Sequence, residues 1–166
     1  MNPAVDTVLV LGWGNLSRGD DALGPLFVAG LRDHARRAVI DQVEFIEEYQ
    51  LQVEHALDLA ARRCVLLVDA SCTCAAPFEV SSPQPFRDAS YSSHAMSPAA
   101  LLQAFLDFYQ EPPPPCTLLA IRGQGFELGA SPGASALHHL TQALAWGRDW
   151  LASVPKDIHR GGFGHA

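Results

Sequence analysis

Two adjacent aspartates, Asp20 and Asp21, follow a glycine-rich stretch that comes directly after an apolar run. The stretch reads Leu11-Gly12-Trp13-Gly14-Asn15-Leu16-Ser17-Arg18-Gly19-Asp20-Asp21-Ala22-Leu23-Gly24-Pro25. This pattern is typical of a buried strand, a short loop and a helix, and open α/β sheets place their ligands at such turns. Because negative charge is favourable at a helix N-terminus, each aspartate taken alone can also be a helix cap. Together, the two carboxylates form a site that attracts a cation.

The spacing of the glycines argues against a dinucleotide at this turn. A dinucleotide-binding turn needs G-x-G-x-x-G, with an acidic residue at the end of the next strand about 20 residues later. Gly12 and Gly14 fit this pattern, but Ser17 stands where the third glycine should be. The acids at the end of the next predicted strand, Glu47 and Glu48, come too late. Two carboxylates would also repel a diphosphate, so a cation is the better match.

Two further residues could share a site with Asp21. Asp69 follows the apolar run 65–68, and His94 lies in a polar loop before a predicted helix. If the first and third strands are neighbours, their carboxyl ends place Asp69 at the edge that carries Asp21. Two carboxylates and an imidazole can bind Zn²⁺, Ni²⁺ or a similar ion, while the nitrogen ligand disfavours Ca²⁺ and Mg²⁺. Taken singly, Asp69 is also an ordinary loop-boundary residue and His94 an ordinary loop histidine.

Apolar strand-like runs alternate with helical patterns along the chain. Continuous apolar runs predict parallel strands covered on both faces, and Ser97-Pro98 is typical of a helix start. The predicted strands are 7–11, 43–47, 64–68, 78–80 and 116–121, and the predicted helices are 21–36, 53–63, 97–109 and 133–154. This order predicts a single three-layer α/β/α domain over residues 1–156, with a twisted, mostly parallel sheet of about five strands. The glycine-rich end, residues 157–166, is expected to be a flexible tail.

Composition sets bounds on partners and compartment. The chain has 166 residues, 48% of them hydrophobic, and a formal net charge of -7. The acidic balance offers no basic footprint for nucleic acid or an anionic membrane, and no apolar run has the length of a membrane span. The start of the chain lacks the features of a secretory signal, and the four cysteines suggest reduced thiols rather than a disulfide framework. We therefore expect a cytoplasmic protein with reduced thiols.

The stretch around Asp21 resembles the opening signature of the [NiFe]-hydrogenase maturation endopeptidases. In that family a GxGN…GDDGxG segment is followed by an aspartate that ends a later strand and by a histidine in a downstream loop. Asp21, Asp69 and His94 match these three positions one by one, and the resemblance runs in order from residue 8 to about residue 130. A departure is Ala22, which replaces the commonest glycine of the signature. The resemblance implies that Asp21, Asp69 and His94 are both the catalytic and the metal-binding residues.

The resemblance also implies an activity and a partner. The partner is the precursor of a hydrogenase large subunit, from which the enzyme removes the C-terminal extension. Nickel carried by this precursor is the implied recognition signal; other divalent ions such as Zn²⁺ or Cd²⁺ can occupy the same site, and no organic cofactor is expected. The expected enzyme is a monomeric peptidase. Aspartic-type and metal-assisted catalysis both stay open, since the chain has no G-x-S-x-G elbow and no cysteine with an evident histidine partner.

A second resemblance concerns the branch within this family. Many members carry Gly-Gly-Thr or Gly-Gly-Ser after the second strand, whereas this chain has Glu48-Tyr49-Gln50-Leu51. This variant, with the segment 122–129, resembles the branch that serves cytoplasmic NAD-linked, bidirectional hydrogenases. Gln50, Arg122 and Glu127 are then expected substrate contacts, although polar loop residues can equally be solvated surface.

Two alternatives to a protease stay open at this point. A non-catalytic maturation chaperone would bind the nickel-loaded precursor through the same residues without cutting it. An autonomous metallohydrolase for small substrates would bind a metal tightly by itself, whereas three ligands with two exposed carboxylates predict weak binding.

Overall fold

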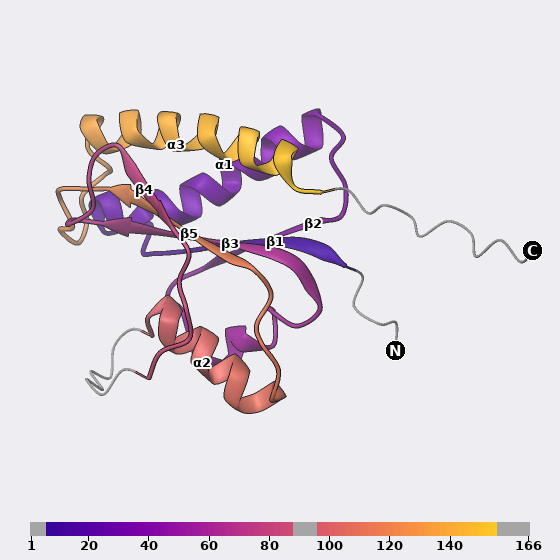
Figure 1. Cartoon of the computed structure of the whole chain (residues 1–166). Helices are drawn as coiled ribbons and strands as arrows, with labels where there is room; N and C mark the ends of the chain where they lie inside the picture. The colour runs from indigo at the N-terminus through magenta and orange to yellow at the C-terminus, as the bar shows by residue number, and fades with distance from the viewer. Residues whose placement is uncertain (1–5, 88–95, 156–166) are drawn as a thin grey trace, which may run out of the picture.

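The computed structural model describes residues 6–87 and 96–155 (Figure 1). His94 and the predicted tail 157–166 lie outside these residues. In chain order the elements are β1 (Thr7–Trp13), η1 (Gly19–Ala22), α1 (Leu23–Arg37), β2 (Val43–Glu48), η2 (Val53–Ala56), β3 (Arg62–Ser71), β4 (Phe78–Ser81), α2 (Pro98–Tyr109), β5 (Cys116–Arg122) and α3 (Ala134–Ser153), where η denotes a 3₁₀ helix.

Within the described residues the strands form one five-stranded sheet in the order β2-β1-β3-β5-β4. The pairs β1–β2, β1–β3 and β3–β5 are parallel, and β4 runs antiparallel to β5 at one edge. The prediction that the first and third strands are neighbours is therefore confirmed. Their register pairs Gly12 with Val68, so the residues that follow each strand emerge at the same edge of the sheet.

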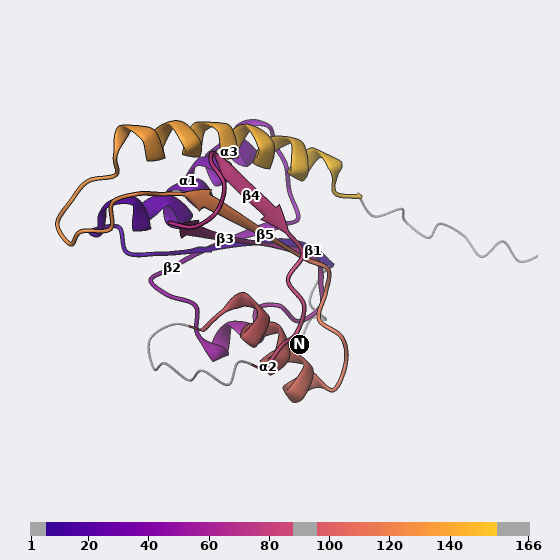
Figure 2. The same cartoon turned by 60° about the vertical axis from the view of Figure 1, so that its left-hand side comes forward.

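Helices cover both faces of this sheet, as the apolar runs predicted. Figures 1 and 2 show α1 and α3 together on one face and α2, with η2, on the other. Alternate residues of β1 serve the two faces: Val8 and Val10 belong to the core under α1 and α3, and Leu9 and Leu11 to the core over α2. Burying such a side chain contributes about 1.5–3 kcal/mol. The predicted three-layer α/β/α fold is confirmed.

The start of α2 is also as predicted. Ser97 is the N-cap, and its hydroxyl oxygen accepts a hydrogen bond from the backbone N–H of Ala100 at 3.1 Å. Pro98 stands at the first helical position, where its missing N–H breaks no hydrogen bond within the helix. Gln110 ends the helix in a left-handed conformation with φ of 55°.

The predicted helix over residues 53–63 is wrong. Only the single turn η2 forms there, and further turns lead into β3 at Arg62. Leu57, expected on the buried face, is 56% exposed, whereas Leu59 is fully buried. Ala61 takes a left-handed φ of 57°, which no α-helix continues. Because β3 begins two residues before the predicted strand, the sheet takes up the last residues of the predicted helix.

No helix among the described residues combines the length and apolar character needed to cross a membrane.

Candidate active site at the carboxyl edge of the sheet

The turn after β1 is packed too tightly to take side chains at its glycines. A Cβ atom at Gly12 would lie 2.6 Å from Val28 Cγ2 and 2.7 Å from the carbonyl oxygen of Gly24. At Gly14, where φ is 150°, a Cβ would overlap the carbonyl oxygen of Asp21. The glycines therefore bring the turn against the protein's own backbone, and they set how far the chain travels before η1.

Asp21 lies in η1 with its carboxylate held by this turn. One oxygen, Oδ2, accepts a hydrogen bond from the backbone N–H of Asn15 at 2.7 Å, and the side chain is half-buried. The side-chain amide of Asn15 donates in turn to the hydroxyl of Tyr49 at 3.0 Å, which links the turn to the end of β2. Asp21 thus stands at the carboxyl edge of the sheet with one carboxylate oxygen fixed.

Asp69 shares that edge, although it lies inside its strand. β3 continues to Ser71, so Asp69 pairs with Ala120 of β5 and does not follow the strand end as predicted. Burial, followed by the nearby charge of Asp21, raises the pKa of Asp69 from 3.8 to about 7. Hydrogen bonds from the Trp13 side chain and the Ala70 backbone oppose this shift only in part. The structure therefore brings Asp21 and Asp69 close enough for their charges to interact.

This pair of carboxylates can do two kinds of chemistry. A carboxyl group with a pKa near 7 can accept or donate a proton at neutral pH, as general acid–base catalysis requires. A divalent cation placed beside both groups would relieve their repulsion and favour the charged form of Asp69. The geometry is consistent with either role.

His94, the third predicted ligand, lies outside the described residues. Within residues 6–87 and 96–155, no group of three His, Cys, Asp or Glu side chains is placed to hold a metal ion. The assignment of His94 to the site accordingly stays a prediction from sequence.

Asp20 points away from Asp21 and is not a helix cap. Neither η1 nor α1 has a side-chain capping bond, and the N-cap of α1 is Ala22. The predicted single helix 21–36 is instead η1 followed by α1, so the cap interpretation of both aspartates is wrong. Burial of Asp20 disfavours its charged form, but hydrogen bonds from three backbone N–H groups outweigh this and lower its pKa.

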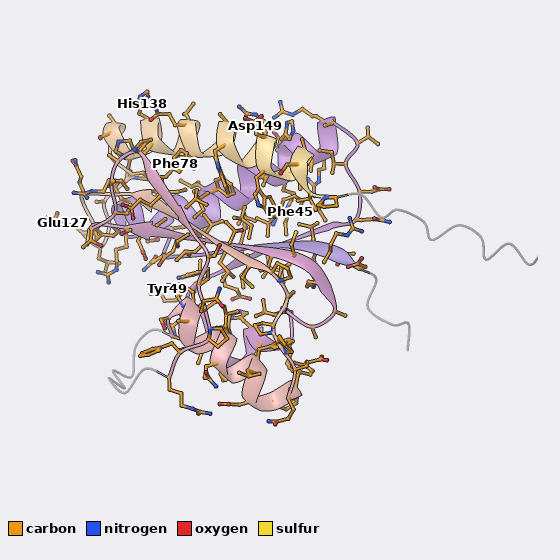
Figure 3. The ribbon with its side chains drawn as sticks, viewed as in Figure 1. Phe45, Tyr49, Phe78, Glu127, His138 and Asp149 are labelled. Carbon is orange, nitrogen blue, oxygen red and sulfur yellow. The ribbon has the colours of Figure 1, made fainter. Side chains whose placement is uncertain are left out.

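The three predicted substrate contacts lie at the carboxyl edge of the sheet and differ in how far they are buried. Gln50 follows β2 and is half-buried. Arg122 ends β5, and its Nη1 donates to the carbonyl oxygen of Cys74 at 2.6 Å, while its Nε is buried without a hydrogen-bond partner. Glu127 is exposed on the loop between β5 and α3 (Figure 3). It lines a pocket of about 490 Å³ that also borders Asp20. Their role as substrate contacts stays a prediction.

The chain is similar in structure to several solved proteins. It matches the [NiFe] hydrogenase maturation protease HycI of Thermococcus kodakarensis KOD1 with a TM-score of 0.69 and 17% identity, covering 89% of this chain and 94% of that one. The hydrogenase maturating endopeptidase HybD of E. coli matches with a TM-score of 0.67 and 24% identity, over 88% and 92% of the two chains. An endopeptidase of Escherichia coli matches with a TM-score of 0.68 and 22% identity, covering 89% of this chain and 94% of that one. The fold is that of hydrogenase maturation proteases. No protein-family model and no curated protein matches the sequence.

The sequence did not predict the groups that support the carboxylates of Asp21 and Asp69. Asn15 and Trp13 belong to the glycine-rich stretch, but nothing in their spacing indicated that one would hold Asp21 and the other Asp69. Tyr49, which the sequence places next to Gln50, meets Asn15 across 34 positions of the chain. Side-chain contacts of this kind follow from the parallel pairing of β2 with β1, not from a local motif.

Proposed function

We propose that this chain is an endopeptidase that removes the C-terminal extension from the large-subunit precursor of a [NiFe] hydrogenase. The observation that carries the proposal is the juxtaposition of Asp21 and Asp69 at the carboxyl edge, where burial and then the charge of Asp21 raise the pKa of Asp69. The fold supports it, because two solved structures that share this fold are named as a [NiFe] hydrogenase maturation protease and a hydrogenase maturating endopeptidase. The substrate assignment rests on this likeness and on the sequence signature.

The nickel of the precursor is the recognition signal in this proposal. Asp21, Asp69 and His94 contact the nickel that the precursor already carries, so it belongs to the substrate and not to the enzyme. The repulsion between the two carboxylates gives a physical reason for this arrangement, since the site gains most when a cation arrives. Zn²⁺ or Cd²⁺ can occupy the same ligands, and no organic cofactor takes part.

Cleavage then requires a water molecule and a group that takes its proton. Water attacks the carbonyl carbon of the scissile peptide, its proton passes to a carboxylate, and the proton is later given to the departing amine. Asp69 is a candidate for this exchange because, without a cation beside it, its pKa of about 7 lets it hold and release a proton near neutrality. Whether the ion also polarises the carbonyl separates a metal-assisted from an aspartic-type enzyme.

The branch of the family is a finer part of the proposal. The segment Glu48-Tyr49-Gln50-Leu51 at the end of β2, with Arg122 at the end of β5 and Glu127 beyond it, resembles enzymes that serve NAD-linked, bidirectional hydrogenases. Gln50, Arg122 and Glu127 lie on loops or strand ends at the edge that carries Asp21 and can therefore contact the precursor. A cytoplasmic, monomeric enzyme is consistent with that branch.

Intact-mass measurement of the precursor tests the proposal. Purified large-subunit precursor, either nickel-loaded or nickel-free, is incubated with the protein, with Asp21→Asn and with Asp149→Asn. Asp149 is exposed on α3 and controls for the loss of one negative charge. We expect loss of one C-terminal peptide only from the nickel-loaded precursor, with the unchanged protein and with Asp149→Asn. An unchanged mass despite complex formation would instead indicate the non-catalytic chaperone.

A further inference from the structure

Asp20 of η1 is bonded to the loop between β5 and α3, which is more than 100 positions away in the sequence. Its carboxylate is 3% exposed, although Asp21 beside it lies at the open edge. Oδ2 accepts hydrogen bonds from the backbone N–H groups of Gln124 at 2.7 Å and Gly125 at 3.0 Å. Oδ1 accepts one from Gly133 at 2.8 Å. One side chain therefore binds both ends of the loop between β5 and α3.

Backbone hydrogen bonds reinforce the same junction. The N–H of Asp20 donates to the carbonyl oxygen of Gly125 at 2.8 Å, and the N–H of Gly19 donates to that of Ala130 at 2.9 Å. The two segments touch at Gly123, where a Cβ would lie 2.8 Å from the Cβ of Asp20. The loop 123–133 is thus bonded to η1 at several points.

The other side of η1 carries the candidate active site. Asp21 follows Asp20 directly, and its Oδ2 is held by the Asn15 N–H at 2.7 Å. Successive residues of a 3₁₀ helix are about 120° apart around its axis. A displacement on the Asp20 side is therefore transmitted through one peptide unit to the residue that faces Asp69.

We propose that Asp20 is a positioning residue, which fastens the loop 123–133 to η1 and thereby fixes where Asp21 stands relative to Asp69. It neither contacts the substrate nor exchanges a proton. The two aspartates of the signature then have separate tasks. Asp20 holds η1 in place, and Asp21 takes part in cleavage. The inference about position stands on the contacts above, and only its consequence for cleavage rests on the proposed function.

The backbone amide of Asn15 is a direct reporter of this role. Its N–H donates to Asp21 Oδ2, an acceptor that lies outside the loop 123–133. We would record amide chemical shifts and hydrogen exchange by NMR in the unchanged protein, in Asp20→Asn and in the charge control Asp149→Asn. An asparagine at position 20 keeps one acceptor oxygen, so at least one of the three donors loses its partner. We expect the Asn15 amide to shift and to exchange faster in Asp20→Asn but not in Asp149→Asn.

A milder variant keeps the test decisive if Asp20→Asn does not fold. Gly123→Ala presses a methyl group against Asp20 without removing any hydrogen-bonding group, so we expect the same changes at Asn15 to be smaller. If the amides of Gln124, Gly125 and Gly133 change while that of Asn15 does not, Asp20 only anchors the loop and the inference is overturned.

The kinetics of cleavage supply an independent measurement. A shift of Asp21 by about 1 Å should lower kcat by about 100-fold and leave KM nearly unchanged. A higher KM with an unchanged kcat would contradict a positioning role. If the unchanged protein cleaves no precursor, the proposed function fails while the NMR result still decides the role of Asp20.

Discussion

Asp20 and Asp21 are neighbours in the chain, but their carboxylates lie in opposite surroundings. Asp20 is almost fully buried, accepts three backbone N–H bonds and has a lowered pKa. Asp21 is half-buried at the carboxyl edge, where its charge raises the pKa of Asp69. On one side of η1 the carboxylate of Asp20 is therefore satisfied by hydrogen bonds, whereas on the other side Asp21 stands near a second carboxylate, that of Asp69 in β3.

This difference separates a carboxylate that stabilises the fold from a pair that costs stability. Hydrogen bonds to the charged form outweigh the burial of Asp20, so its ionisation favours the folded state. The same ionisation at Asp69 is opposed by burial and by Asp21. Groups that are kept in unfavourable surroundings are characteristic of functional sites, because their strain is relieved by a ligand or by proton transfer. The open side of η1 is accordingly where binding should have its largest effect.

Replacing Asp69 should have the largest effect on activity. Asp69→Asn keeps the shape of the side chain but cannot take a proton and is a poorer ligand for a divalent ion. We expect cleavage of the nickel-loaded precursor to fall by about 10³-fold, the size of a general acid–base contribution. Single-turnover assays by intact mass would measure it, with Asp149→Asn as the charge control. Activity within a few-fold of normal would exclude Asp69 from the chemistry.

The same variant should be more stable than the unchanged protein at neutral pH. Because the folded pKa of Asp69 is raised from 3.8 to about 7, the folded state binds its proton more tightly than the unfolded chain does. The stability contributed by this group is therefore present at low pH and is lost as pH rises from about 4 to 7. Above pH 7, Asp69→Asn should gain on the order of 1–3 kcal/mol. Urea unfolding across this range would detect it; a gain independent of pH would contradict the assignment.

Removing the carboxylate of Asp20 should have the opposite effect on stability. Asp20→Ala leaves three buried N–H groups without their acceptor, and we expect a loss of about 2–4 kcal/mol. Since the pKa of Asp20 is lowered below 3.8, its stabilising effect is complete above that value and is lost as pH falls through the lower folded pKa. The stability difference between the unchanged protein and Asp20→Ala should thus shrink on acidification. A difference that grows at low pH would show that Asp20 is not ionised in the folded state.

The sequence predicted that Asp21 and Asp69 share one edge of the sheet. It did not predict that Asp20 and Asp21 lie on opposite sides of η1 in different surroundings. Continuous apolar runs identified the parallel strands, and their pairing made Asp21 and Asp69 neighbours. Local chemistry was sufficient at Ser97 and Pro98, where the cap and the first helical residue are as expected. These signals succeeded because each depends on a few consecutive residues or on a repeated pattern.

The failures share one physical cause, which is contact between distant parts of the chain. Asp20 accepts hydrogen bonds from residues 104 to 113 positions away, so its local pattern indicated only a helix cap. Likewise, the apolar spacing of residues 53–63 indicated a helix, but the pairing of Arg62 with Thr7 extends β3 into that segment. In both places tertiary contacts override the local preference.

Tyr49→Phe should have the smallest effect on stability, and it tests the side of η1 that carries Asp21. The Tyr49 side chain is 64% exposed, and its hydroxyl accepts a hydrogen bond from the Asn15 side chain at 3.0 Å. Tyr49→Phe removes that acceptor, but water can replace it at an exposed site, so we expect a loss of about 0.5–1 kcal/mol at most. Urea unfolding of Tyr49→Phe and Asp20→Ala at one pH would compare the two sides directly. Equal losses would mean that the active-site side is held as firmly as the closed side, and that Asp21 does not depend on Asp20 for its position.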